Sequence, residues 1–299
     1  NSHGMSYGPT DDKASTDAVM RAMDLGLNFF DTADVYGWGH AEELLGKCFR
    51  GRRDRIILAA KVGADFYQGT GFQTFTPEYI RFALEKSLAR LQTDYLDVYQ
   101  LHNPPLKLLG NEATYATLKE LKKEGKIRAW GVSVFTAVEG ITAINVGHPD
   151  CLQIAYNIFS FRPAEQLFPL AFEKGCAIIA REPLANGFLT GKYKSGKPFR
   201  FAAGDMRKSW PDDYIKARIE AAAQLGFLER VGQSLPQAAL RYSLSEASVS
   251  TVIVGIKTPE QADENIEAVQ AGLKETELAK IREMQARGFK PEREIWKES

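Results

Sequence analysis

Four polar side chains stand at or near the ends of three apolar runs in this sequence of 299 residues. Asp31 and Tyr36 lie in NFFDTADVYG, Lys61 in IILAAKV and His102 in YLDVYQLH. Taken singly, each has a structural explanation: a turn cap, a lysine that reaches the surface, or a core histidine. Because an unpaired charge beside an apolar run costs several kcal/mol, their joint occurrence predicts one cluster in which the groups satisfy one another.

These four groups together have the chemistry needed to protonate and polarise a carbonyl. A tyrosine hydroxyl, with an ordinary pKa of ~10, is a weak acid at neutral pH, and a nearby ammonium group stabilises its phenolate. An aspartate holds that ammonium charged and in place, and a histidine can donate a hydrogen bond to an oxygen that gains negative charge. None of these groups supplies electrons, so the pattern favours carbonyl reduction by a hydride from a bound cofactor.

Metal chemistry has little support in the sequence. The remaining histidines, His3, His40 and His148, have the settings of turn or helix-cap residues, and Asp34 is interpreted as a turn residue. No H-x-H or H-E-x-x-H pattern occurs, so no metal site is predicted. A metal-dependent barrel enzyme is kept as an alternative hypothesis.

The elements that must position the four groups alternate between β-rich apolar runs and amphipathic stretches, which is typical of repeated βα units. The predicted strands cover residues 27–33, 56–62, 95–102, 129–134, 152–157, 177–182 and 251–255. Eight such units close a barrel whose active site lies at the carboxyl ends of the strands. We predict an α/β (β/α)8 TIM barrel, a single domain over residues 1–299, with its first strand missing from this sequence and a long loop at about 192–235.

Two predicted helices have clear ends. Thr10-Asp11-Asp12 can cap one helix that Gly26 closes, and Thr76-Pro77-Glu78 opens another. The second helix places apolar residues along one stripe, namely Ile80, Leu84, Leu88 and Leu91.

Composition excludes several partners. Lys plus Arg equals Asp plus Glu at 38 each, so no bulk positive field attracts nucleic acid or an anionic membrane. No apolar run approaches the ~20 residues of a membrane span. The three cysteines are widely spaced without C-x-x-C, which favours a reducing compartment. We expect a cytoplasmic protein with a small-molecule carbonyl or alcohol partner; the sequence does not predict its oligomeric state.

At these residues the chain resembles the aldo-keto reductases, from about Gly8 to Asn265. The family's catalytic tetrad of Asp, Tyr, Lys and His falls here on Asp31, Tyr36, Lys61 and His102. The resemblance implies NADP(H)-dependent reduction of an aldehyde or ketone, or the reverse oxidation of an alcohol or sugar, with the tyrosine as general acid. The family binds its nicotinamide dinucleotide without a Rossmann fold, in agreement with the absence of G-x-G-x-x-G between a strand and a helix.

The resemblance also implies a cofactor groove built from three motifs. GVSVF (131–135) resembles the family's GVSNF, with Val134 in place of the usual Asn; AREPLANGFLTGKY (180–193) looks like the pyrophosphate segment. VGIKTPEQADENIEA (254–268) resembles the segment that binds the adenosine 2′-phosphate, where Lys257 would favour NADPH over NADH. The residues carried over are Ser133, Gln153, Arg181, Leu184, Asn186, Gly187, Gly255, Lys257, Gln261, Glu264 and Asn265.

Two further expectations concern the substrate pocket and the alternative to an active enzyme. The substrate pocket is predicted near Trp38, Phe66-Tyr67, the 192–235 segment and the tail with Trp296. The segment 254–265 is also similar to the potassium-channel β subunits, so an NADPH-binding regulatory subunit with slow turnover is the alternative to an active reductase.

Overall fold

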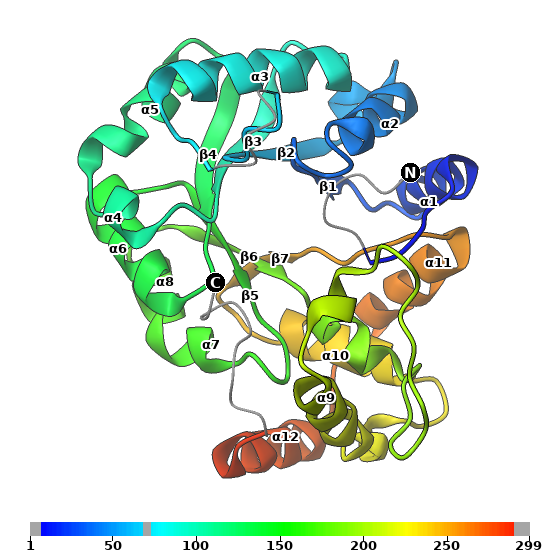
Figure 1. Ribbon diagram of the computed structural model, residues 1–299. Coiled ribbons are helices and arrows are strands. Elements are labelled where there is room, and N and C mark those ends of the chain that lie inside the picture. Colours follow the sequence, from blue (N-terminus) through cyan, green and yellow to red (C-terminus); the bar gives the residue numbers. More distant parts are fainter. Residues whose placement is uncertain (1–6, 68–72, 290–299) are drawn as a thin grey trace.

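Seven parallel strands form one curled sheet in chain order, and helices surround it (Figure 1). The computed structural model describes residues 7–67 and 73–289, so His3 and Trp296 lie outside the described residues. The strands are β1 (Phe29–Asp31), β2 (Ile57–Val62), β3 (Leu96–His102), β4 (Ile127–Ser133), β5 (Cys151–Ala155), β6 (Ala177–Arg181) and β7 (Val249–Val252). All seven predicted strands are confirmed, with ends that differ by a few residues.

The helices follow the strands in the βα alternation that the sequence predicted. They are α1 (Asp12–Asp24), α2 (His40–Phe49), α3 (Pro77–Leu91), α4 (Leu106–Leu109), α5 (Ala116–Lys123), α6 (Ala137–Gly147), α7 (Arg162–Gln166), α8 (Phe168–Glu173), α9 (Asp212–Ala223), α10 (Leu235–Leu244), α11 (Pro259–Glu267) and α12 (Glu275–Arg287). The described residues thus supply seven strands of a (β/α)8 barrel. None of the helices in these residues is both long and apolar enough to cross a membrane.

The inside of the curled sheet changes from apolar to polar along the strands. Alternate strand residues face the same side, and one such set forms a small apolar cluster around Ala59, Val98, Cys151 and Ile179. Two residues further along β2, β3 and β5, the same face carries Lys61, Gln100 and Gln153. The polar groups therefore stand on an apolar floor, at the carboxyl ends of the strands.

Helix ends follow local capping chemistry. The Asp11 carboxylate accepts a hydrogen bond from the Ala14 amide at 2.8 Å, and Gly26 follows α1 with a φ of +85°. The Thr76 hydroxyl accepts from the Tyr79 amide at 3.3 Å before α3. Both predicted helices are confirmed. The prediction that His40 caps a helix was wrong: Gly39 is the cap, and His40 is the first residue of α2.

The 192–235 segment contains no strand, but helix α9 lies within it, an element not predicted from the sequence. Ile215, Ile219 and Ala222 of this helix are buried at helical spacing. The segment therefore packs against the barrel through an apolar face.

Helices α2 and α3 approach closely because Gly46 has no side chain. A Cβ at this position would lie 2.4 Å from the Arg90 carbonyl oxygen and 2.9 Å from the Leu91 Cα. We expect Gly46→Ala to lower the free energy of unfolding by roughly 1–3 kcal/mol through this overlap, measured by urea denaturation. Gly226→Ala, whose Cβ would have no neighbour within 4 Å, is the control. Equal stability of the two variants would contradict the close contact.

Candidate active site

The structure brings Asp31, Tyr36, Lys61 and His102 together at the carboxyl ends of β1, β2 and β3. The Lys61 ammonium is fully buried, pairs with the Asp31 carboxylate, and donates to the Thr32 carbonyl at 2.9 Å. Its Nζ lies 5.0 Å from the centroid of the Tyr36 ring. The rings of Tyr36 and His102 meet edge to face at 5.9 Å. The four side chains thus form one contiguous cluster.

The charge of Lys61 is held by its two neighbours. Burial acts to lower the pKa of the Lys61 ammonium, but the Asp31 carboxylate and then Tyr36 outweigh it, so the pKa is raised. Asp31 is itself oriented by two amides, since its Oδ2 accepts from Gln153 Nε2 at 2.8 Å and from Gln100 Nε2 at 3.2 Å. The site therefore keeps a fixed positive charge beside the tyrosine.

His102 is a neutral imidazole in this environment. Burial, and next the Lys61 ammonium and Arg181, lower the pKa of His102 to about 3. A neutral imidazole still has one N–H to donate, so His102 can act as a hydrogen-bond donor without bringing a second positive charge.

The turn after β1 explains why Tyr36 follows Asp31 so closely. The Tyr36 amide donates to the Ala33 carbonyl at 3.1 Å, and the Trp38 amide donates to the Val35 carbonyl at 3.1 Å. Gly37, Trp38 and Gly39 all have positive φ, at +60°, +56° and +91°. Three consecutive residues in the left-handed region make a tight turn, and this conformation is strained for Trp38. The turn folds Tyr36 back toward Lys61.

All three predicted cofactor residues on β4 to β6 already have partners on the protein. Ser133 lies opposite His102 in register, and its hydroxyl donates to Asn103 Oδ1 at 3.1 Å. Gln153 is turned toward Asp31 in this structure. Arg181 pairs with Glu182 and donates to the Val134 carbonyl at 3.2 Å.

The backbone of the loop after β6 has the conformation of an anion-binding turn, but part of its hydrogen-bonding capacity is used within the loop. Ala185, Asn186 and Gly187 have φ values of +47°, +56° and +90°. The Gly187 amide donates to the Leu184 carbonyl at 2.9 Å, so this amide is engaged within the loop. The Asn186 amide group donates to Glu182 Oε2 at 3.0 Å.

Tyr7 joins this loop to the segment before α11. Its hydroxyl donates to Asn186 Oδ1 at 2.5 Å, while its carbonyl accepts from Lys257 Nζ at 2.8 Å. The Lys257 amide donates to Gln261 Oε1 at 2.7 Å, just before the amino end of α11. Two predicted cofactor residues that are far apart in sequence therefore lie on either side of one tyrosine.

The remaining predicted residues sit around the start of α11 and α10. Glu264 Oε1 accepts from the Ser234 hydroxyl at 2.9 Å, and Asn265 is partly exposed. Gly255 is exposed, and a Cβ there would meet no atom within 4 Å. There is therefore open space beside the Gly255 backbone at this edge of the barrel.

Sequence reasoning missed several residues that hold the site. Gln100 contacts Asp31, and Asn103 contacts Ser133. Glu182 pairs with Arg181, and Arg207 donates to the Asn186 carbonyl at 2.8 Å. A signal existed for Gln100, which is polar inside an apolar run and two residues before His102, hence on the same strand face.

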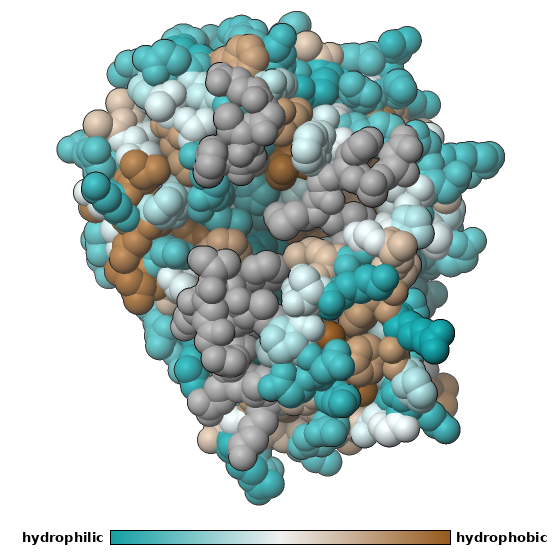
Figure 2. Space-filling view, viewed as in Figure 1, coloured by the Kyte–Doolittle hydropathy of each residue, from teal (hydrophilic) through white to brown (hydrophobic). Residues whose placement is uncertain are grey.

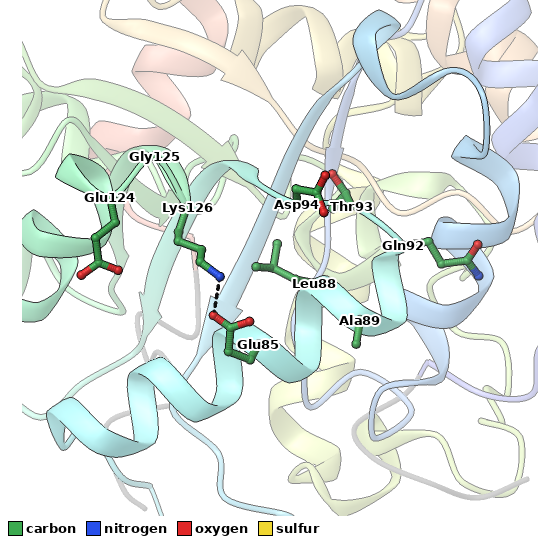
Figure 3. A pocket seen from close by; sticks show the side chains of 9 residues that line it. All are labelled: Glu85, Leu88, Ala89, Gln92, Thr93, Asp94, Glu124, Gly125 and Lys126. Carbon is green, nitrogen blue, oxygen red and sulfur yellow. Dashed lines mark hydrogen bonds and ion pairs between the residues drawn. The ribbon is translucent and has the colours of Figure 1, made fainter.

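The rest of the described surface has fewer features that indicate a ligand site. Figure 2 shows a hollow at the centre of one face of the molecule, with hydrophilic residues visible inside it. A separate groove of about 540 Å³ lies among Leu88, Asp94, Gly125 and their neighbours (Figure 3). It is at the amino ends of β3 and β4, away from the tetrad, and the Lys126–Glu85 ion pair at 2.7 Å crosses it. Among the described residues, no three His, Cys, Asp or Glu side chains are grouped so as to hold a metal ion.

A family model decides the relationship that this geometry indicates. The aldo/keto reductase family model matches residues 1–286. The chain belongs to the aldo/keto reductase family. The aldo/keto reductases are oxidoreductases, and the catalytic role of Asp31, Tyr36, Lys61 and His102 in this chain stays a prediction.

Its relatives in this family include three curated proteins. The chain is 34% identical over 267 residues to the aldo-keto reductase YhdN of Bacillus subtilis, covering 87% of this chain and 80% of the relative. It is 33% identical over 298 residues to the aldo-keto reductase yakc (NADP+) of Schizosaccharomyces pombe, with coverages of 94% and 85%. It is 28% identical over 294 residues to the NADH-specific methylglyoxal reductase of Escherichia coli, with coverages of 93% and 89%.

Two solved structures of aldo/keto reductases have the same fold. The holo form of AKR11C1 from Bacillus halodurans is 32% identical with a TM-score of 0.79, covering 98% of this chain and 95% of that one. The glycerol dehydrogenase AKR11B4 from Gluconobacter oxydans is 27% identical with a TM-score of 0.80, with coverages of 98% and 90%.

The depressed pKa of His102 predicts a dependence of stability on pH. Because the folded pKa of about 3 lies below the ordinary 6.5, the unfolded chain binds more protons between these values. The contribution of His102 to stability should therefore be lost as pH falls below about 6.5. We expect His102→Gln to lose less stability than the wild type between pH 7 and pH 5 in urea denaturation.

His40→Gln is the control for this test, because His40 is exposed and forms its ion pair with Asp12 at the surface. It should keep the wild-type slope. A wild-type slope in His102→Gln would show that His102 is not held neutral in the folded state.

Proposed function

We propose that this aldo/keto reductase catalyses NADP(H)-dependent reduction of an aldehyde or ketone, or the reverse oxidation of an alcohol. The observation that carries the proposal is a buried ammonium, Lys61, paired with Asp31 and lying beside the Tyr36 ring, with a neutral His102 against the same ring.

The proposed proton transfer follows from this arrangement. Tyr36 donates its proton to the carbonyl oxygen of the substrate, and the adjacent Lys61 ammonium stabilises the phenolate that remains. His102 donates a hydrogen bond to the same oxygen as it gains charge. Asp31 takes no part in the transfer, and its role is to fix the position and charge of Lys61.

We propose that a nicotinamide dinucleotide binds beside these four residues and would supply the hydride when bound. Lys257 offers a cation next to the amino end of α11, where oriented amides favour a phosphate, and the exposed Gly255 leaves space for the ligand. Ser133, beside His102, would hold the carboxamide. One relative carries NADP+ in its name and another is NADH-specific, so the preference for NADPH rests here on Lys257 alone.

The substrate side of the proposed pocket is aromatic. Trp38 is 52% exposed, its ring lies 6.0 Å from Phe66, and Phe66 stacks on Tyr67 at 4.2 Å. Such a wall favours small carbonyl compounds with an apolar face. A panel of aldehydes, ketones and sugars with each cofactor tests the function. A protein that binds NADPH tightly but completes no repeated turnover on any of them would instead be the regulatory type.

Tyr36→Phe should abolish carbonyl reduction while NADPH binding is nearly unchanged. Loss of a general acid typically lowers the rate by roughly 10²–10⁴-fold, and the phenyl ring keeps the packing against His102. The measurement is kcat with an aldehyde together with fluorescence titration of NADPH. Tyr95→Phe, at the amino end of β3, is the control and should react at the parent rate. If Tyr36→Phe also reduces aldehydes at that rate, the acid is another group.

Lys257→Ala should weaken NADPH binding more than NADH binding. A charge-assisted hydrogen bond to a phosphate contributes about 1.5–3 kcal/mol, so the affinity for NADPH should fall by roughly tenfold or more while NADH changes little. Fluorescence titration with both cofactors measures this, with the exposed Lys47→Ala as control. Equal losses for the two cofactors would remove the argument for a 2′-phosphate at Lys257.

A further inference from the structure

A second polar cluster lies directly beside the tetrad. Among the described residues, the buried side-chain oxygens without a hydrogen-bond partner of good geometry are Thr32 Oγ1, both oxygens of Asp34, Glu42 Oε1 and the Tyr67 hydroxyl. All come from the turn after β1, from α2 and from the segment after β2. Buried polar atoms are nearly always paired, so their concentration in one place beside a catalytic centre calls for a physical account.

Asp34 is the central member of this cluster. It lies in the predicted turn, but it is fully buried, which the sequence did not indicate. Its amide donates to the Lys61 carbonyl at 3.3 Å, and it precedes Tyr36 by two residues. The titratable groups that face its carboxyl from the surrounding elements are Glu42 of α2, Tyr79 and Arg90 of α3, Lys61 of β2, Tyr99 of β3 and Tyr67.

The cations near Asp34 already have carboxylate partners. Arg90 pairs with Glu42 at 2.7 Å, and Lys61 pairs with Asp31. An ionised Asp34 would be a third carboxylate beside two cations and away from solvent. The hydrogen bond from the Val35 backbone amide offsets only part of the cost of burying its charge. Burial, and next the Glu42 carboxylate, raise the pKa of Asp34 to about 7. The group therefore changes charge within the physiological range.

We propose that Asp34 is a positioning residue of the tetrad, which must carry a proton for Lys61 to assist Tyr36 at full strength. Ionised Asp34 adds a negative potential at the Lys61 ammonium and opposes the negative charge that develops on Tyr36 as it gives up its proton. Protonated Asp34 leaves the field of Lys61 intact. This inference rests on the proposed reduction and names a residue that controls its dependence on pH.

The first test compares Asp34→Asn with the wild type in reduction of 4-nitrobenzaldehyde by NADPH between pH 6 and pH 8.5. The asparagine has the shape of aspartic acid but cannot ionise. The two kcat values should agree near pH 6, and the ratio of variant to wild type should rise with pH to on the order of tenfold, the effect of one nearby buried charge. Asp94→Asn, in the groove at the other end of β3, should follow the wild type at every pH.

The second test needs no substrate. A folded pKa raised above the ordinary 3.8 means that Asp34 destabilises the folded protein increasingly as pH rises from about 4 to about 7. In urea denaturation, Asp34→Asn should therefore become progressively more stable than the wild type over this interval. If the variant fails to fold, the infrared band of a protonated carboxyl in the wild type, present at pH 6 and lost by pH 8.5, replaces the comparison.

These outcomes separate the two claims. A wild-type protein that reduces no carbonyl in the panel counts against the proposed function. An active wild type whose pH profile runs parallel to that of Asp34→Asn overturns the role of Asp34, whatever the stability shows. A constant difference in stability, or no carboxyl band at pH 6, overturns it as well, because Asp34 would then be ionised throughout.

Discussion

The ion pair between Lys61 and Asp31 is the interaction on which the rest of the site depends. A lysine with no solvent contact is tolerated inside a barrel only if its charge is matched, and a carboxylate on the neighbouring strand supplies the match. Parallel strands make this possible, because their carboxyl ends meet at one edge and place residues distant in sequence within bonding distance. The amides of Gln100 and Gln153 then fix the carboxylate, so the pair has one geometry.

The environment of this pair explains why the pKa values of two other groups are shifted toward the uncharged form. Burial, and next the Lys61 ammonium, lower the pKa of His102, whereas burial, and next the Glu42 carboxylate, raise the pKa of Asp34. Both shifts reduce the number of charges that the interior must accommodate. The apolar cluster around Ala59 and Val98 lies below these groups and presents no polar surface to water. The electrostatic effects on their pKa values therefore stay strong.

The sequence predicted the strands and the clustering of four polar side chains because both produce local patterns. An apolar run that ends in a lysine or histidine is visible without knowing its neighbours, as Lys61 and His102 demonstrate. Side-chain contacts that arise only from tertiary packing were not predicted. The burial of Asp34 depends on α2 and α3 closing over the turn, and Tyr7 reaches Asn186 across 179 positions of sequence. Helix α9 was missed because Gly and Pro on either side of it indicate a loop.

The position of Tyr7 has a practical consequence for work with this protein. One residue close to the amino end of the described chain touches the loop after β6 through its ring and the approach to α11 through its backbone. A substitution at Tyr7 would change the surroundings of Asn186 and Lys257 together, so a ligand affinity measured with such a variant reports on both segments and not on one.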